Sequence, residues 1–73
     1  MKDRFSNSTI SDSCEIILAE SSNPLHVNEL YSCIVEGGFE FKGRFPMVSI
    51  VVALNRNPKI KKVSPGTYDL LLK

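Results

Sequence analysis

Proline and glycine residues divide the 73-residue chain into short units, and this division limits the elements that it can form. Asn23-Pro24 interrupts the first apolar pattern, Gly37-Gly38 the second and Asn57-Pro58 the third. Proline lacks a backbone N–H, and glycine readily takes the left-handed conformation that closes a helix. Within each short unit, the period of the apolar residues must therefore distinguish helix from strand.

The first unit is predicted to be a helix that begins near Ile10. Thr9 is placed to cap it, and Asp12 in its first turn favours the helix dipole. Residues 1–8 are polar and aperiodic, and we expect a flexible arm there, whose Lys2 and Arg4 are candidates for minor-groove contacts. The apolar residues at helical spacing are Ile10, Cys14, Ile17 and Leu18.

The second unit is predicted to be a helix that Gly37-Gly38 terminates. His26 and Glu29 form an imperfect capping box at its start, and Asn28 is the alternative cap. Its apolar stripe consists of Val27, Leu30, Tyr31 and Ile34. The loop that follows has three aromatic residues, which we expect to anchor it in the core: Phe39, Phe41 and Phe45.

The third unit, PMVSIVVALNR, is the most ambiguous. Its continuous run of β-forming residues is typical of a buried strand. Pro46 at the start and Asn57-Pro58 at the end instead bracket a helix over residues 46–56. In that helix the inward stripe is Met47, Ile50, Val51 and Leu54. The outward side then presents Val48, Ser49, Val52 and Arg56.

The last unit is predicted to be a β-hairpin. Ser64-Pro65-Gly66-Thr67 fits a type II turn, in which glycine takes the positive φ at the third position. Residues 60–63 do not alternate cleanly, so we expect a bulge at Lys61-Lys62. The order is three helices and then a two-stranded hairpin. We therefore predict an α+β, mainly α, winged helix-turn-helix domain over residues 9–73, in which the hairpin is the wing.

Charge is distributed unevenly along the chain, although the net charge is only +1. Residues 1–41 hold two basic and seven acidic residues, a net charge of −5. Residues 42–73 hold seven basic residues and one acidic residue, a net charge of +6. A basic surface on an acidic body suits an anionic partner, although such cations also occur on ordinary solvated faces.

Composition places the chain among intracellular globular domains. Apolar residues make up 42% and charged residues 23%. No apolar run approaches the roughly 20 residues that cross a bilayer, and the N-terminus lacks a signal-peptide core. We therefore expect no membrane contact, and a cytoplasmic location in a prokaryote or a nuclear one in a eukaryote. Cys14 and Cys33 lack the spacing of a zinc site, so we expect reduced thiols and neither metal nor cofactor.

Two stretches, NPLHVNELYSCIVEGGF and FPMVSIVVALNRNPKIKKVSPGTYDL, together resemble the HARE-HTH family. These winged helix-turn-helix modules occur in additional-sex-combs-like chromatin proteins, in some restriction endonucleases and in an RNA polymerase accessory subunit. The resemblance covers residues 10 to 71 and implies that residues 46–56 are the recognition helix. Family members often have threonine or serine before Pro46, where this chain has Phe45.

The basic half of the chain and the resemblance together predict a DNA-binding module. The outward side of residues 46–56 has almost no side chains that form bidentate contacts with base edges, so we expect phosphate contacts and weak sequence specificity. Such a module would position a larger protein on duplex DNA in transcription, chromatin regulation or restriction. The candidate contact residues are Lys42, Arg44, Ser49, Arg56, Lys59, Lys61 and Lys62.

A protein-interaction or autoregulatory module is the alternative. Its candidate residues are Val48 and Val52, with Met47 beside them, because an apolar patch rimmed by charge is typical of docking surfaces. The apolar end of the chain, Leu70 to Lys73, is compatible with a homodimer or with a longer parent protein. Catalysis by this segment is not expected, because no catalytic motif is present. His26 with Cys33 is the only conceivable nucleophile–base pair, and a capping histidine and a packed thiol are the favoured roles of these two residues. A nuclease domain, if present, would lie elsewhere in the parent.

Overall fold

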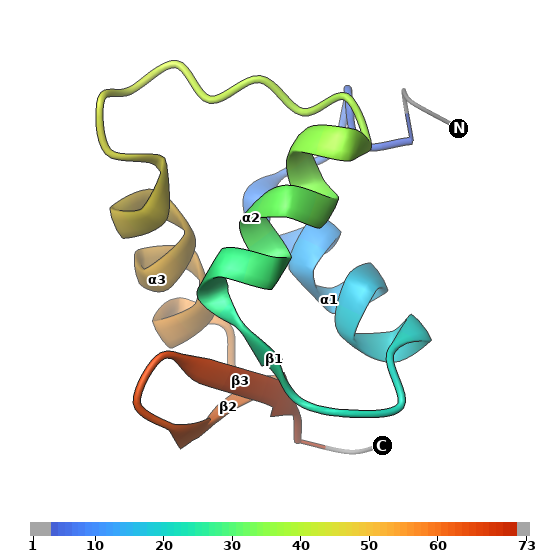
Figure 1. Ribbon diagram of the computed structural model, residues 1–73, viewed down its shortest axis with the longest axis vertical. Coiled ribbons are helices and arrows are strands. Elements are labelled where there is room, and N and C mark those ends of the chain that lie inside the picture. The colour runs from blue at the N-terminus through green and yellow to red at the C-terminus, as the bar shows by residue number, and fades with distance from the viewer. Residues whose placement is uncertain (1–3, 72–73) are drawn as a thin grey trace.

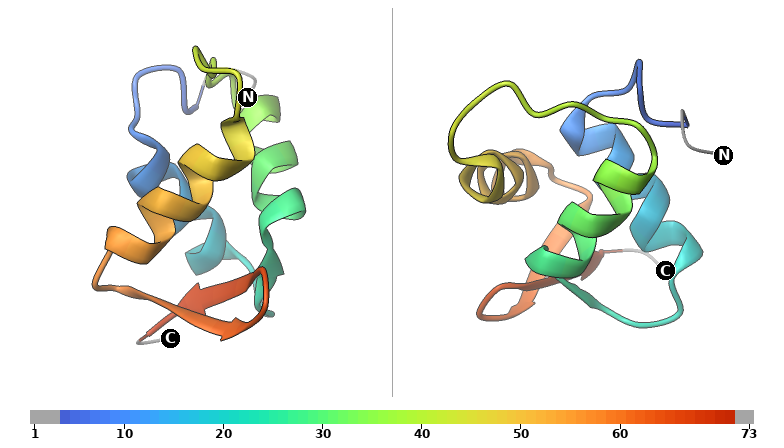
Figure 2. Two further views of the ribbon diagram at one scale, coloured as in Figure 1. Left: turned by 90° about the vertical axis from the view of Figure 1, so that its left-hand side faces the viewer. Right: turned by 45° about the horizontal axis from the view of Figure 1, so that its top comes forward.

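The computed structural model describes residues 4–71 and shows three helices standing on one small antiparallel sheet (Figure 1). The helices are α1 (Ile10–Glu20), α2 (Val27–Glu36) and α3 (Pro46–Arg56). The strands are β1 (Leu25–His26), β2 (Ile60–Ser64) and β3 (Thr67–Leu70). The sheet closes one end of the helical bundle, and α3 lies on an outer face of the molecule (Figure 2). The fold is therefore α+β, as predicted, with an arrangement compatible with a winged helix.

The sheet has three strands, so the predicted two-stranded hairpin was incomplete. Its order is β1-β3-β2, and Leu25 of β1 pairs with Tyr68 of β3. A two-residue strand is too short to show a period, and its partner lies more than forty positions away, so only tertiary pairing reveals it. The irregularity in β2 lies between Lys62 and Ser64, and not at Lys61-Lys62 as expected.

The helical prediction for residues 46–56 is confirmed. Ile50 is 0% and Leu54 is 1% exposed, and both lie in the common core of the three helices. Burial of one such side chain contributes about 1.5–3 kcal/mol, which outweighs the few tenths of a kcal/mol that a valine costs in a helix. The expected inward stripe is deepest at these two residues, while Met47 and Val51 are half-buried.

The caps of the first two helices match the sequence prediction. Thr9 Oγ1 accepts a hydrogen bond from the Asp12 N–H at 3.0 Å. At the start of α2, His26 Nδ1 accepts from the Asn28 N–H at 3.1 Å, and Glu29 Oε1 accepts from the His26 N–H at 3.2 Å. His26 is therefore the cap, and the alternative assignment to Asn28 was wrong.

The N-terminal segment contributes a core residue, which the expected arm over residues 1–8 did not include. Phe5 is 2% exposed, and its N–H donates to the Gly37 carbonyl at 2.7 Å. A Cβ on Gly37 would collide with the Phe5 ring, so glycine is needed there. A lone aromatic among polar residues shows no period, so no sequence pattern indicates this packing. Lys2 lies outside the described residues.

Phe45 does not anchor the loop before α3, contrary to the prediction. Its side chain is 69% exposed, and it stands at the N-cap of α3 without making a side-chain cap hydrogen bond. Phe39 and Phe41 are half-buried and pack edge to face, with ring centroids 4.9 Å apart. Phe41 also contacts Tyr31 of α2, at 5.4 Å between centroids. Two aromatic residues therefore suffice to hold the loop, and the third faces solvent.

Candidate nucleic-acid interface

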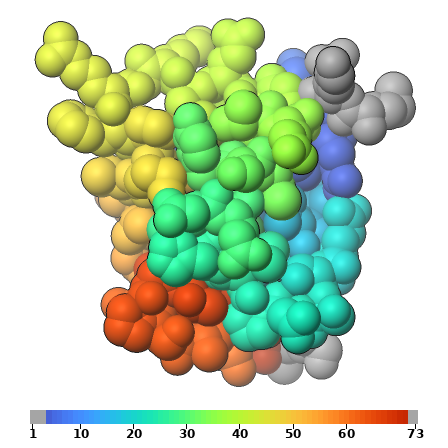
Figure 3. All heavy atoms as spheres, in the orientation of Figure 1, coloured from blue at the N-terminus to red at the C-terminus, as the bar shows by residue number. Residues whose placement is uncertain are grey.

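Residues 41–68 contain no aspartate or glutamate, and they include all of α3 and β2. All six cations of this segment are exposed: Lys42, Arg44, Arg56, Lys59, Lys61 and Lys62. They come from the loop before α3, from the C-terminal end of that helix, from the link that follows it and from β2. In Figure 3 the side chains of that loop, in yellow, project beyond the body of the molecule. These exposed cations thus precede and follow α3 along the chain.

The outer face of α3 is apolar. Phe45, Val48 and Val52 follow one another at helical spacing and are 69%, 58% and 41% exposed; we call them the α3 apolar strip. Ser49 lies beside them and is exposed, and its Oγ donates to the Phe45 carbonyl at 3.4 Å. The helix therefore offers few groups that read base edges, whereas its uncapped N-terminus offers backbone donors to an anion.

The two lysines of β2 lie on opposite faces of the sheet. Adjacent residues of a strand alternate between faces, and the register pairs Lys62 with Tyr68 but Lys61 with Asp69. The Tyr68 hydroxyl donates to Asn55 Oδ1 of α3 at 3.5 Å, so its face of the sheet is the one that meets α3. Lys62 is therefore on the α3 side, and Lys61 is on the far side.

Lys59 is directed toward α1 and has a carboxylate within ion-pair distance. Its Nζ lies 3.8 Å from Glu15 Oε1, and its backbone N–H donates to Asn57 Oδ1 at 2.9 Å. The other five cations form no ion pair within residues 4–71. An exposed pair of this kind contributes little to stability, but it neutralises Lys59 locally.

The side chain of Asn57 forms hydrogen bonds between the end of α3, α1 and the residue before β2. The sequence predicted Asn57 only as part of the signal that ends the helix. It is 8% exposed, and its Nδ2 donates to Ser11 Oγ and to Glu15 Oε2, each at 2.7 Å. These bonds join the end of α3 to α1. They fix where Arg56 and the start of β2 leave the bundle.

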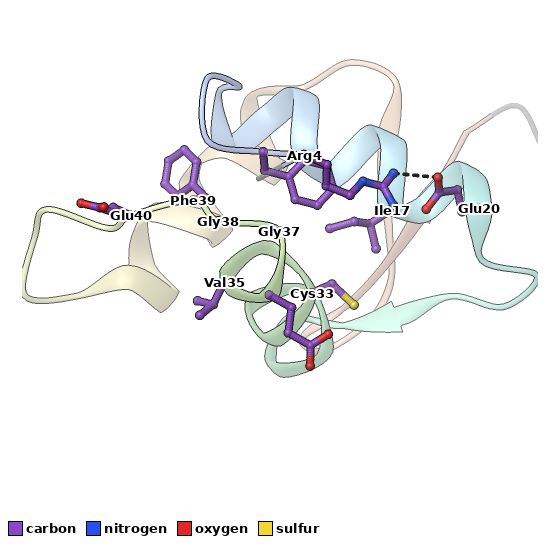
Figure 4. Close-up of a pocket in the computed structure, with 11 residues that line it drawn as sticks. Arg4, Ile17, Glu20, Cys33, Val35, Gly37, Gly38, Phe39 and Glu40 are labelled. Atoms are coloured by element: carbon purple, nitrogen blue, oxygen red, sulfur yellow. Dashed lines mark hydrogen bonds and ion pairs between the residues drawn. The ribbon is translucent and has the colours of Figure 1, made fainter. Parts of the chain in front are cut away.

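One hollow in the described part of the chain lies away from this basic surface. It lies between the N-terminal segment, α1 and the end of α2, and includes the ion pair of Arg4 with Glu20 at 2.7 Å (Figure 4). Arg4 also lies over the Phe5 ring, 4.7 Å from its centroid. Its hydrogen bond holds the pKa of the Glu20 carboxyl below the ordinary value. Arg4 is thus bound to the body in this structure rather than extended.

The cysteines lack the features of nucleophiles. Burial raises the pKa of the Cys14 thiol to about 12, and burial followed by the charges of Glu36 and Glu29 raises that of Cys33. Thiolates are the reactive form, so both environments disfavour reaction. His26, the base of the nucleophile–base pairing considered with Cys33, uses Nδ1 as the α2 cap, the role that the sequence predicted for it. Within residues 4–71, no group of three or more His, Cys, Asp or Glu side chains is placed to hold a metal.

In comparisons with known proteins, no family model, curated protein or solved structure matches the chain. The described part of the chain also contains no helix long and apolar enough to cross a membrane.

Proposed function

We propose that this domain binds duplex DNA, mainly through phosphates and with weak sequence specificity, and positions a larger protein there. The observation that carries the proposal is the acid-free segment of residues 41–68, which includes all of α3 and whose six cations are all exposed. Cations at phosphates release counterions from DNA, a contribution to affinity that is independent of sequence. The proposal includes the winged-helix assignment and membership of the HARE-HTH family.

Within this interface the cations have unequal roles. Lys42 and Arg44 precede α3, and Arg56 ends it, so these three flank the helix along its length. Lys62 extends the surface onto the sheet on the α3 side. Lys61 and Lys59 face away from α3, and they contribute to the field of the domain more than to direct contacts. Ser49 is the polar side chain of α3 best placed for a direct contact.

The test is fluorescence anisotropy of a labelled random-sequence duplex, titrated with the domain from low to physiological salt. We expect micromolar affinity, and the logarithm of the binding constant should fall linearly with the logarithm of the salt concentration. The slope should be about −0.9 for each phosphate contacted. Replacing the duplex by one of different sequence should change the affinity little. Absence of binding at the lowest salt would overturn the proposal and leave the six cations as a solvated face.

The α3 apolar strip supports a second candidate, a protein-docking or autoregulatory module. Three neighbouring side chains that are 41% to 69% exposed form a surface unusual for an unpartnered helix. Val48→Asp combined with Val52→Asp should then abolish capture of partners by the parent protein, while Lys62→Glu should not. If the folded double variant retains its partners in a pull-down, the strip is not the docking site.

A further inference from the structure

Residues 61–65 form the longest continuous run of exposed residues in the described part of the chain. They read Lys-Lys-Val-Ser-Pro and cover all of β2 after Ile60 and the first position of the following turn. In the strand order β1-β3-β2, β2 is an edge strand, so its outer backbone is not paired with another described strand. An enzyme that binds an extended peptide therefore finds this whole segment at the surface.

Ser64 is distinctive among the hydroxyl residues, because it alone in the 73-residue sequence is followed by proline. Its side chain is exposed, and within residues 4–71 its hydroxyl makes no hydrogen bond. Thr67, its partner across the hairpin, is half-buried and is followed by the buried Tyr68. Proline-directed serine kinases select their acceptor by the proline that follows it, and kinases in general select by sequence pattern around the acceptor. Ser64 meets both the sequence and the exposure requirement.

We propose that Ser64 is a phosphorylation site for a proline-directed serine kinase, and that its phosphate weakens DNA binding by the wing. In the reaction the Ser64 Oγ–H bond breaks and an Oγ–P bond forms to the γ-phosphoryl group of Mg·ATP. ADP leaves, and the hydroxyl proton is released to the kinase base and then to solvent. The site itself stands on the exposed segment, whereas its effect on DNA rests on the function proposed above.

The electrostatic effect follows from the position of the phosphate. A phosphoserine carries about −1.5 to −2 charges at neutral pH, enough to cancel two lysines. At about 3.3 Å per strand residue, the Ser64 backbone is at most roughly 7 Å from that of Lys62 and at most roughly 10 Å from that of Lys61, because the irregularity between Lys62 and Ser64 shortens the strand. These separations are comparable with the Debye length of about 8 Å at physiological salt, so screening removes only part of the interaction. The register pairs Ser64 with Thr67, which puts the Ser64 side chain on the Lys61 side of the sheet, so its phosphate acts on the proposed DNA surface through the electrostatic field of the hairpin. Phosphorylation would change the wing from basic to neutral and repel the DNA backbone.

The first arm of the experiment tests the site. The folded domain is incubated with a proline-directed serine kinase and Mg·ATP, and intact and fragment mass spectra locate the phosphate. We expect one phosphate at Ser64, none in Ser64→Ala, and strong loss of phosphorylation in Pro65→Ala, which keeps the acceptor and both lysines. Thr67 is the internal control and should remain unmodified. An unmodified folded domain, or a phosphate at another residue, would overturn the site.

The second arm measures duplex affinity for the phosphorylated and unphosphorylated domains at the same salt. We expect at least a tenfold loss on phosphorylation, with a shallower salt dependence. Ser64→Asp should lose affinity, while the matched neutral variant Ser64→Asn should bind as wild type. Equal affinities of both forms would refute the regulatory role but not DNA binding. If neither form binds the duplex, the proposed function fails and the regulatory role with it, while the modified site remains.

Discussion

The Nδ2 of Asn57 lies 2.7 Å from Glu15 Oε2 and joins the C-terminal end of α3 to the middle of α1, 42 positions earlier in the chain. The same amide donates to Ser11, and its Oδ1 accepts from the Lys59 N–H. All three bonds are formed by one buried side chain at the point where α3 meets the sheet. The orientation of α3 relative to β2, and so the shape of the proposed DNA surface, depends on this residue.

Replacement of this side chain should destabilise the domain. Asn57→Ala removes three hydrogen bonds from a buried position and leaves their partners unsatisfied, so we expect a loss of about 1–3 kcal/mol in the free energy of unfolding. Urea denaturation measures it. Asn28→Ala, at an exposed position of α2, is the matched control and should change stability little. Equal stability of the two variants would show that the Asn57 network is not structural.

The two lysines of β2, Lys61 and Lys62, test which face of the sheet belongs to the proposed DNA surface. Lys62→Glu should weaken duplex binding more than Lys61→Glu, because Lys62 is on the α3 side of the sheet and Lys61 is opposite Asp69. Both exchanges change net charge equally, so a general field effect would weaken binding to the same extent. Anisotropy titrations at one salt concentration compare them. The double variant should bind most weakly and remain folded; unchanged affinity would remove the wing from the interface.

A better N-cap on α3 should stabilise the domain. Phe45 makes no side-chain cap and is 69% exposed, so Phe45→Thr should add a cap hydrogen bond and lose little burial. We expect stabilisation of about 0.5–2 kcal/mol, measured by urea or thermal unfolding. Phe45→Ala removes the ring without supplying a cap and should not stabilise. If the threonine and alanine variants are equally stable, the N-terminus of α3 does not limit the stability of the fold.

The N-terminal segment should be required for stability. Phe5→Ala empties a site that is 2% exposed against α2 and Gly37, at a cost of about 3–5 kcal/mol. For a domain of this size such a loss is a large share of total stability. Asn7→Ala, two residues further at an exposed position, should cost much less. A Phe5→Ala variant as stable as wild type would restore the view of residues 1–8 as a detached arm.

The buried thiol predicts a stability change in alkaline solution. Because the pKa of Cys14 is raised to about 12 in the folded chain from 9.0, the unfolded chain releases this proton first. Stability from this group is therefore complete below pH 9 and falls as the pH rises from 9 to 12.

In a Cys33→Ser background, a thiol reagent should modify Cys14 only at the rate of unfolding. Rapid modification of the native variant would contradict its burial.

Sequence patterns determined the local elements of this protein. The 3.6-residue period, the Thr9 and His26 caps and the glycine pair predicted α1 and α2. Pro46 and Asn57-Pro58 predicted α3 against the β-preference of its valines. These signals are local, since a cap or a period is complete within one or two turns of chain. The cluster of cations was also visible in the sequence.

Only the tertiary structure decided the long-range relationships. The pairing of β1 with β3, the burial of Phe5 and the exposure of Phe45 each depend on segments distant in the chain. The same applies to the candidate site, where the register separates Lys61 from Lys62 and the contact with α1 partly neutralises Lys59. The chemical type of a residue does not specify the face of the helix or strand on which its side chain lies. That is fixed when helices and strands pack, because packing selects one register and one buried face for each element.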